Sequence, residues 1–259
     1  MRPSGIPSPP GYETGKMDGI DELQPLSRLS GALADKGYVH LDARDFRSLA
    51  GAQDPAEFAS FAAMWSDMPL DDHMADGGRY RRRRHAAFRA QGGGLIRKPH
   101  QAHFQSKDHN PLNGDRQRWF APVHDAFVAH PIAQRLFALC TPLFASIEGG
   151  YPARCWDVEL HQFRIEARGG ALGLPTPEGM HRDGVDWVLV MLTGRTNVDA
   201  GTTRIIDEAG RRDSFTLTEP GEAVLLDDRR IRHGVTAIRA LDPALPAHRD
   251  VLVVTWRAA

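Results

Sequence analysis

The pattern His-x-Asp occurs three times in this chain, beginning at His40, His181 and His248. Two imidazoles and one carboxylate can hold a divalent iron ion on one face, and His-x-Asp supplies two of these three ligands. With 12 histidines in the chain, about one such pattern is expected by chance. The pattern alone therefore identifies no site, and its surroundings must decide.

Two of the three patterns lie in unfavourable positions. Only 11 residues follow His248 and none of them is histidine, so a second imidazole would have to come from upstream. His40 lies in the N-terminal half, which we expect to be mostly helical, and we interpret it as a half-exposed strand residue.

The middle pattern has a suitable setting. His181 and Asp183 directly precede the strand-like run "WVLVMLT", and side chains two apart on extended backbone point the same way. His233 follows in a second strand-like run, and Arg249 opens a third, where a guanidinium can clamp the distal carboxylate of a keto acid. The order of these four residues along one β region predicts a metal site of His181, Asp183 and His233 beside an anion site at Arg249. The alternative is a core histidine and a surface ion pair.

Two acidic residues, Asp227 and Asp228, stand just before the run that holds His233. We interpret them as turn residues that pair with Arg229 or Arg230. The alternative is that they orient a metal ligand by hydrogen bonding.

Periodicity divides the rest of the chain into two parts. Residues 1–17 are rich in Pro, Gly and Ser and are predicted to form a loose arm. The predicted helices cover Leu23–Leu33, 55–68 and 122–147, the last one broken at Pro131, and "YVHL" is a short strand. The helical part, about 20–150, is expected to pack outside a β part.

That β part covers about 155–257. It holds seven short runs, each β-branched or alternating and each bounded by turn residues, which is typical of a sandwich or barrel. The runs are "WDVELHQFRIEA", "DWVLVMLTG", "TTRIID", "RDSFTLT", "EAVLLDD", "IRHGVTAI" and "DVLVVTW". We therefore expect an α+β fold in which residues 18–259 form a single domain.

Composition excludes several function classes. The net charge of −1 gives no reason to expect nucleic acid or a membrane surface as a partner. No run of 18 apolar residues exists, and the N-terminus has no apolar signal region, so we expect a cytoplasmic protein without a membrane span. Cys140 and Cys155 form no disulfide or zinc pattern and are interpreted as free thiols. Nothing indicates an oligomeric state.

Four blocks of the sequence resemble the bacterial iron(II)/2-oxoglutarate-dependent amino-acid dioxygenases, a group that includes L-isoleucine dioxygenases and N-succinyl-amino-acid hydroxylases. The resemblance runs from about 155 to 256, and "GGRYRRRRHAAF" (77–88) is similar to an Arg-rich stretch of the same enzymes. The four blocks are "HQFRI", "HRDGVDWVLVMLTGRTNVDAGTTRIID", "LLDDRRIRHGVTAI" and "HRDVLVVTW". The resemblance implies a distorted double-stranded β-helix, or jelly roll, with buttressing N-terminal helices.

It also implies roles for residues. The implied iron ligands are His181, Asp183 and His233, and Arg249 is the implied anchor of 2-oxoglutarate. Further implied contacts to cosubstrate or substrate are Gln162 and Arg164, and an arginine of the 81–84 run would hold the substrate carboxylate. Alternation selects Arg81 and Arg83 for that role, and the alternative is that the run is a solvated basic face.

The implied cofactors are Fe(II), 2-oxoglutarate and O2, with ascorbate as the reductant in vitro. The implied reaction hydroxylates an aliphatic C–H of a small amino acid and releases succinate and CO2. The substrate stays open between a free amino acid, a cyclic imino acid such as pipecolic acid or proline, and an N-substituted amino acid, and sulfoxidation, desaturation or epoxidation could replace hydroxylation. Two competing hypotheses are a cupin-type metalloenzyme, which would have no need of Arg249, and a nucleic-acid-binding module that uses the arginine run.

Overall fold

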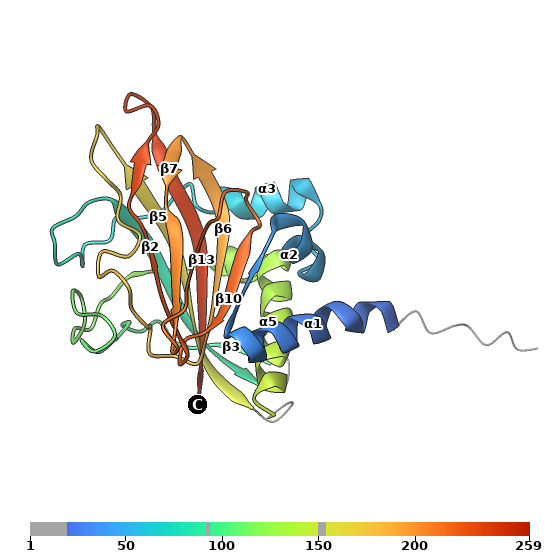
Figure 1. Cartoon of the computed structure of the whole chain (residues 1–259). Helices are drawn as coiled ribbons and strands as arrows, with labels where there is room; N and C mark the ends of the chain where they lie inside the picture. The colour runs from blue at the N-terminus through green and yellow to red at the C-terminus, as the bar shows by residue number, and fades with distance from the viewer. Residues whose placement is uncertain (1–19, 92–93, 150–153) are drawn as a thin grey trace, which may run out of the picture.

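A computed structural model describes residues 20–91, 94–149 and 154–259, so the predicted arm at 1–17 lies outside the described residues. Its centre is one large, mainly antiparallel sheet, here called the major sheet (Figure 1). In spatial order its strands are β1 (Tyr38–Leu41), β10 (Ala223–Asp227), β6 (Trp187–Thr196), β13 (Ala247–Ala258), β5 (Cys155–Ala167), β2 (Arg81–Gln91) and β3 (Gly94–Arg97), with β4 (Ala121–Pro122) beside β2.

A smaller sheet faces the major sheet. It consists of β11 (Ile231–Val235), β8 (Thr202–Asp207) and β9 (Arg212–Thr216), and a separate pair joins β12 (Ile238–Ala240) to β7 (Val198–Ala200). Apolar side chains of both sheets meet in one buried cluster, in which Val188 and Val224 of the major sheet join Ile205 and Ile231. The predicted jelly-roll core and its seven strands are confirmed, whereas the short β7 and β12 were not predicted.

The helices cover the other face of the major sheet (Figure 1). They are α1 (Ile20–Lys36), α2 (Ala43–Leu49), α3 (Pro55–Ala63), α4 (Asp125–Val128) and α5 (Pro131–Ile147). The break predicted at Pro131 is confirmed, because proline is well suited to the first position of a helix and here begins α5. In front of it, the His130 side chain accepts a hydrogen bond from the Ile132 amide and caps the helix.

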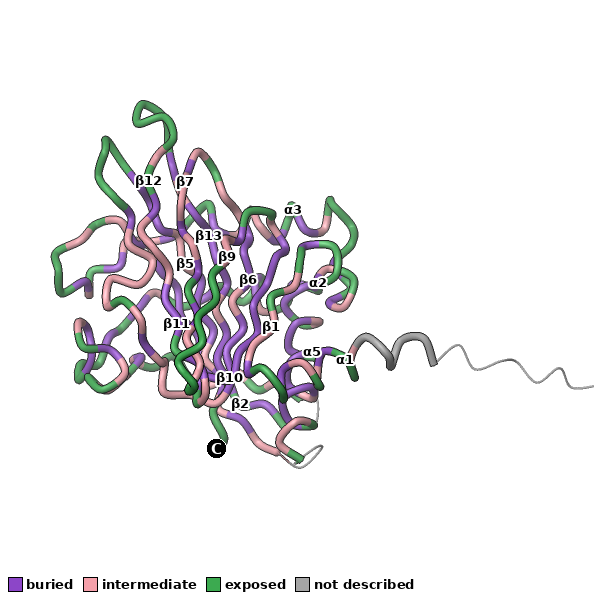
Figure 2. Tube along the Cα trace, in the orientation of Figure 1, coloured by how far each residue is buried: buried purple, intermediate pink, exposed green. Residues whose placement is uncertain are grey.

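Because side chains alternate along each strand, one face of the major sheet packs against the helices and the other faces the smaller sheet. In Figure 2 the central strands are buried along most of their length. On β13, Leu252, Val254 and Trp256 pack against the helices in the main core. The odd-numbered side chains of β13, which include Arg249, Val251 and Val253, therefore face the space between the two sheets.

Phe144 of α5 joins the helices to this core. Its ring stacks on Trp187 with centroids 4.8 Å apart and meets the edge of Trp256 at 5.0 Å. We expect Phe144→Ala to lower the free energy of unfolding by about 3–5 kcal/mol, because it leaves a cavity between two buried indoles. Chemical denaturation would measure this loss. Phe104→Ala, at an exposed ring, should change stability by less than about 0.5 kcal/mol.

The expectation that the N-terminal half packs outside the β core is wrong in one respect, since four of its segments are strands of the major sheet. β1 pairs with β10, and β2 pairs with β5 over its whole length, from Arg81 opposite Ile165 to Gln91 opposite Cys155. Hydrophobic patterning did not reveal β2 because its first four residues are arginines. Three of these arginines, Arg81, Arg83 and Arg84, are nevertheless buried.

Two smaller expectations concern cysteines and membranes. Both Cys140 and Cys155 are free thiols, and burial raises the pKa of Cys140 to about 12. Within the described ranges, no helix has both the length and the apolar character needed to cross a bilayer.

Candidate metal centre

A cavity of about 530 Å³ lies between the two sheets. This is large enough for two small organic molecules. Its lining includes His181, Asp183 and His233 together with Arg249, so the four residues of the sequence-predicted constellation converge on one space. The histidines and aspartates of the other two His-x-Asp patterns are not part of this lining.

The backbone brings the two histidines together. His181, in the loop before β6, exchanges two backbone hydrogen bonds of 2.9 Å with His233 on β11. The strand that carries His233 can approach this loop because the next residue is Gly234. A Cβ there would lie 2.8 Å from the carbonyl oxygen of Gly179, which is too close for a side chain.

The ligand atoms form a compact group. The Asp183 carboxylate lies 3.6 Å from His181 Nε2 and 3.4 Å from His233 Nε2. His181 Nδ1 donates to the Gly179 carbonyl at 3.0 Å, and this tautomer leaves the lone pair on Nε2. His233 Nε2 is buried and has no hydrogen-bond partner among the described residues. Both imidazoles thus present a nitrogen toward the carboxylate.

The electrostatics favour positive charge at this point. Burial lowers the pKa of His233, but the carboxylates of Asp183 and Asp228 outweigh burial and raise it to about 10. The pKa of Asp183 is held well below its usual range, since the neighbouring imidazoles of His181 and His233 outweigh the effect of its own burial. A divalent ion can replace the protons that this arrangement attracts. Two imidazoles and one carboxylate on adjoining elements fit Fe(II).

Asp228 lies next to the predicted ligands and contacts both the loop that carries Asp183 and the His233 ring. Its buried carboxylate accepts hydrogen bonds from the backbone amides of Asp183, Gly184 and Val185 at 3.0, 2.8 and 3.2 Å. It also lies 3.5 Å from His233 Nε2. Asp228 lies in the turn after β10, as expected, but its carboxylate accepts from these amides instead of pairing with Arg229 or Arg230, so it fits the alternative of a ligand-orienting carboxylate. Asp227 does pair with Arg229, as expected.

We expect Asp228→Asn to weaken Fe(II) binding by about 10–100-fold. The asparagine side chain lacks the negative charge that faces His233. Only its oxygen can accept hydrogen bonds, so the loop that carries Asp183 loses at least one of the bonds that hold it. Metal titration of the variant, with circular dichroism to verify folding, would measure the effect. Asp227→Asn, which disturbs only the turn, is the matched control, and equal weakening in both variants would contradict the assigned role.

Arg249 is the second part of the predicted site. It is 1% exposed, and its Nε and Nη2 have no hydrogen-bond partner among the described residues. Burial and, to a smaller extent, the neighbouring Arg195 lower its pKa to about 10, while Asp250 acts in the opposite direction. A buried guanidinium with unused donors on a cavity wall is a site for an anion, above all for a carboxylate.

The predicted alternation of the arginine run is seen in the structure. Arg81 and Arg83 line the cavity, whereas Arg82 pairs with Glu166 and Arg84 donates to backbone carbonyls. The run is not a solvated basic face, because three of its four members are buried. This burial also removes the surface on which the nucleic-acid hypothesis depended.

Arg118 lines the cavity together with Arg81 and Arg83, and the sequence gave no reason to select it. Arg118 is 2% exposed, and its Nε and Nη2 have no hydrogen-bond partner among the described residues. Arg83 lies over the Phe120 ring at 3.9 Å, and its Nε likewise has no hydrogen-bond partner among the described residues. Among these three guanidinium groups, Arg81 is paired with Asp71 at 2.8 Å. The group has donors left for an anion.

Gln162 and Arg164 lie elsewhere. Both side chains point from β5 toward the face opposite the cavity. There Gln162 donates to the Met64 carbonyl, and Arg164 forms a bidentate ion pair with Asp250 at 2.7 Å. Neither residue is part of the cavity lining. Their position does not support the contact to cosubstrate or substrate that the resemblance implied.

The alternate residues of the same strand do face the cavity. Glu159 and His161 lie there with His103, and His85 stands behind them. The i, i+2 spacing of Glu159 and His161 in "VELHQF" was visible in the sequence. What was missing was the pairing of β5 with β2 and the position of the loop at His103.

Comparison with known proteins agrees with this geometry. The family model of the 2OG-Fe dioxygenases matches residues 62–255. The L-isoleucine-4-hydroxylase of Bacillus thuringiensis is 26% identical over 156 residues, which are 60% of this chain and 64% of that protein. The 3(1)-hydroxy-L-isoleucine 4-dioxygenase of Pantoea ananatis (strain AJ13355) is 25% identical over 154 residues, which are 59% and 62% of the two chains. The aligned part thus spans less than two thirds of either relative.

A solved structure supports the fold over almost the whole chain. The crystal structure of a bsmA homolog from Methylobium petroleophilum PM1 superimposes with a TM-score of 0.80 at 38% identity, covering 92% of this chain and 93% of that one. The family model covers more than half of the chain and includes every residue of the metal centre and Arg249. This chain belongs to the 2OG-Fe dioxygenase family.

Proposed function

We propose that the protein is an Fe(II)/2-oxoglutarate-dependent dioxygenase that hydroxylates an aliphatic C–H of a small amino acid. One observation carries the proposal: a His-Asp-His group lines the same cavity as Arg249, whose Nε and Nη2 have no hydrogen-bond partner in the part of the chain that the structure describes. Membership of the 2OG-Fe dioxygenase family and the likeness to two enzymes named for isoleucine chemistry support it.

His181, Asp183 and His233 would hold the iron, and Arg249 would bind the distal carboxylate of 2-oxoglutarate. The iron supplies activation of O2, coupled to the conversion of 2-oxoglutarate to succinate and CO2, and one oxygen atom enters the substrate C–H bond. The protein fixes the positions of the reactants and limits water, which decides the carbon that reacts. Apolar side chains such as Val190, Val251 and Val253 line the cavity and serve this purpose.

The substrate carboxylate would lie against the guanidinium groups of Arg81, Arg83 and Arg118. These groups are buried, and desolvation holds the pKa of Arg83 and of Arg118 below the usual value, so an anion that neutralises them would be bound firmly. The same features suit a free amino acid, a cyclic imino acid or an N-substituted amino acid. A panel of substrates must distinguish among the three.

The test mixes purified protein with Fe(II), ascorbate, 2-oxoglutarate and one panel member at a time: free aliphatic amino acids, pipecolic acid, proline, and their N-acetyl and N-succinyl derivatives. The proposal predicts substrate-dependent succinate together with a product heavier by one oxygen atom. Asp183→Ala serves as the blank. Tight 2-oxoglutarate binding without succinate from any member would reject the amino-acid substrate and keep the iron centre, whereas neither binding nor turnover would reject both.

A further inference from the structure

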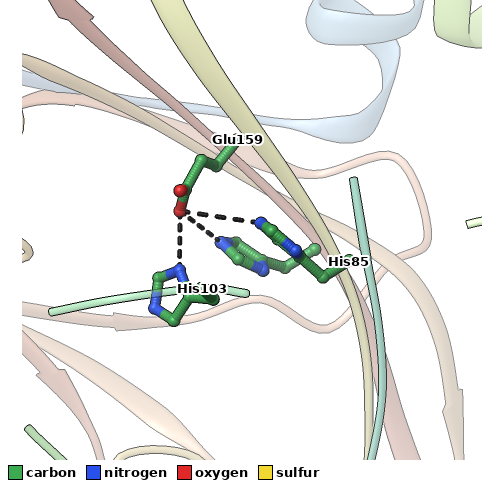
Figure 3. A group of neighbouring side chains, drawn as sticks. His85, His103 and Glu159 are labelled. Atoms are coloured by element: carbon green, nitrogen blue, oxygen red, sulfur yellow. Dashed lines mark hydrogen bonds and ion pairs between the residues drawn. The ribbon is translucent and has the colours of Figure 1, made fainter. Parts of the chain in front are cut away.

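A second group of metal-binding side chains lies in the wall of the same cavity, outside the iron centre. It consists of His85 on β2, His103 on the loop after β3, and Glu159 and His161 on β5, and is here called the His-Glu cluster. Figure 3 labels His85, His103 and Glu159 of this cluster. Each residue offers one ligand atom, and these atoms all lie within 4.8 Å of one another. None of the four belongs to the iron centre or to the predicted anion sites.

The imidazoles converge on one oxygen of Glu159. His103 Nδ1 lies 2.7 Å from Oε2, His161 Nε2 lies at 3.6 Å and His85 Nε2 at 3.8 Å. Figure 3 shows the three contacts meeting at this atom. Ligand atoms around a zinc ion lie about 2.0–2.2 Å from it, so neighbouring ligands are about 3–4 Å apart. The cluster needs only small side-chain shifts to enclose such an ion.

The donors are in the protonation state that a metal requires. Burial lowers the pKa of His85, of His161 and of His103, the last to about 4, so all three imidazoles are neutral at neutral pH. Burial alone would raise the pKa of Glu159, but its contacts with the three rings lower it well below the usual range. The cluster therefore contains neutral imidazoles around an ionised carboxylate.

His85 gives an independent reason to expect a ligand. It is fully buried, yet neither ring nitrogen has a hydrogen-bond partner among the described residues. A buried polar group without a hydrogen bond destabilises the folded state. The ring is aimed at Glu159, and a metal ion between the two would use the nitrogen that is otherwise without a partner.

His161 has a different role from the other two rings. Arg83 Nη2 donates to its Nδ1 at 3.0 Å, so the neutral ring carries its proton on Nε2, which faces Glu159. His161 therefore orients the carboxylate and is no ligand itself. The ligand set that results has two imidazoles and one carboxylate, and the Glu159 side chain keeps 28% exposure toward the cavity.

We propose that His85, His103 and Glu159 bind a second divalent transition-metal ion, of the zinc type, with an open coordination position facing the cavity. Three protein ligands of this kind with one position left for a small molecule are typical of non-structural zinc sites. The ion would offer its open position to a carboxylate or amine of a molecule in the cavity. The positive charge of Arg83 beyond His161 opposes the ion, so we expect a site that exchanges its metal and is emptied by chelators.

The test uses cobalt(II) as the probe, because four-coordinate cobalt gives intense visible absorption that zinc lacks. Chelator-treated full-length protein with Asp183→Asn and His233→Gln, which disable the iron centre, is titrated with cobalt(II). We expect one bound ion per chain with a four-coordinate spectrum. Adding Glu159→Gln should raise the cobalt dissociation constant by at least about a hundredfold, because a ligand is lost rather than a supporting contact. This test does not depend on catalytic activity.

Matched controls exclude a general effect on folding. Asp157→Asn changes a carboxylate on the same strand and cavity wall, and His100→Gln changes a nearby histidine outside the cluster, so both should leave cobalt binding unchanged. Should Glu159→Gln fail to fold by circular dichroism, His103→Gln, on a loop, replaces it. Absence of cobalt binding when the iron centre is disabled, or binding that survives loss of Glu159 or His103, would overturn the proposal.

Discussion

Replacing any one of His181, Asp183 and His233 by alanine is expected to reduce iron-dependent succinate formation below detection. Each residue supplies one of three ligands, and each loss also removes a contact that orients the others, since Asp183 lies within 3.6 Å of both imidazoles. The measurement is succinate release with Fe(II), ascorbate and 2-oxoglutarate, together with the iron content of each variant.

The His-x-Asp pattern that begins at His248 provides the control for this prediction. His248 is partly exposed and lies 3.6 Å from Asp250, away from the metal centre. His248→Ala should retain iron and succinate formation, because it shares only the sequence pattern with His181. Normal turnover in any of the three ligand variants would show that the iron is held elsewhere.

Replacing Arg249 by alanine is expected to raise the concentration of 2-oxoglutarate needed for half-maximal succinate formation by about tenfold or more. Hydrogen bonds to charged groups contribute about 1.5–3 kcal/mol, and 1.4 kcal/mol corresponds to a factor of about ten. The Nε and Nη2 groups of Arg249 are buried and have no hydrogen-bond partner among the described residues. A bound carboxylate can therefore accept hydrogen bonds from both without displacing another acceptor. Iron content should not change, since Arg249 is no ligand.

Two other arginines show how specific this effect is. Arg239, an exposed partner of Asp199, should tolerate alanine without any change in the 2-oxoglutarate requirement. Arg164 is already held by both oxygens of Asp250, so its loss should affect stability more than cosubstrate binding. An unchanged requirement in Arg249→Ala would contradict the anchor.

The core of the fold could be read from the sequence because its signals are local. Strands such as β6 and β13 alternate or run apolar between turn residues, and Pro131 marks the start of α5. The metal pair was identifiable for the same reason, since the two-residue spacing of His181 and Asp183 places both side chains on one side. His233 needed only the expectation that its strand belongs to the same β unit.

The parts that could not be predicted depend on contacts between distant segments. β2 begins with four arginines, and only its pairing with β5 shows which of them face the cavity. The resemblance drew attention to Gln162 and Arg164, whereas the register of β5 turns Glu159 and His161 inward instead. The sequence did not favour a ligand-orienting role for Asp228, because the amides that donate to its carboxylate lie more than 40 positions earlier in the chain.

Crystals grown without oxygen from protein mixed with Fe(II) and 2-oxoglutarate would test the central claim most directly, through anomalous diffraction at the iron absorption edge. We predict one strong iron peak among His181, Asp183 and His233, with the distal carboxylate of 2-oxoglutarate against Arg249. Iron confined to the His-Glu cluster, or a keto acid bound away from Arg249, would contradict the assignment of the iron centre and its cosubstrate site.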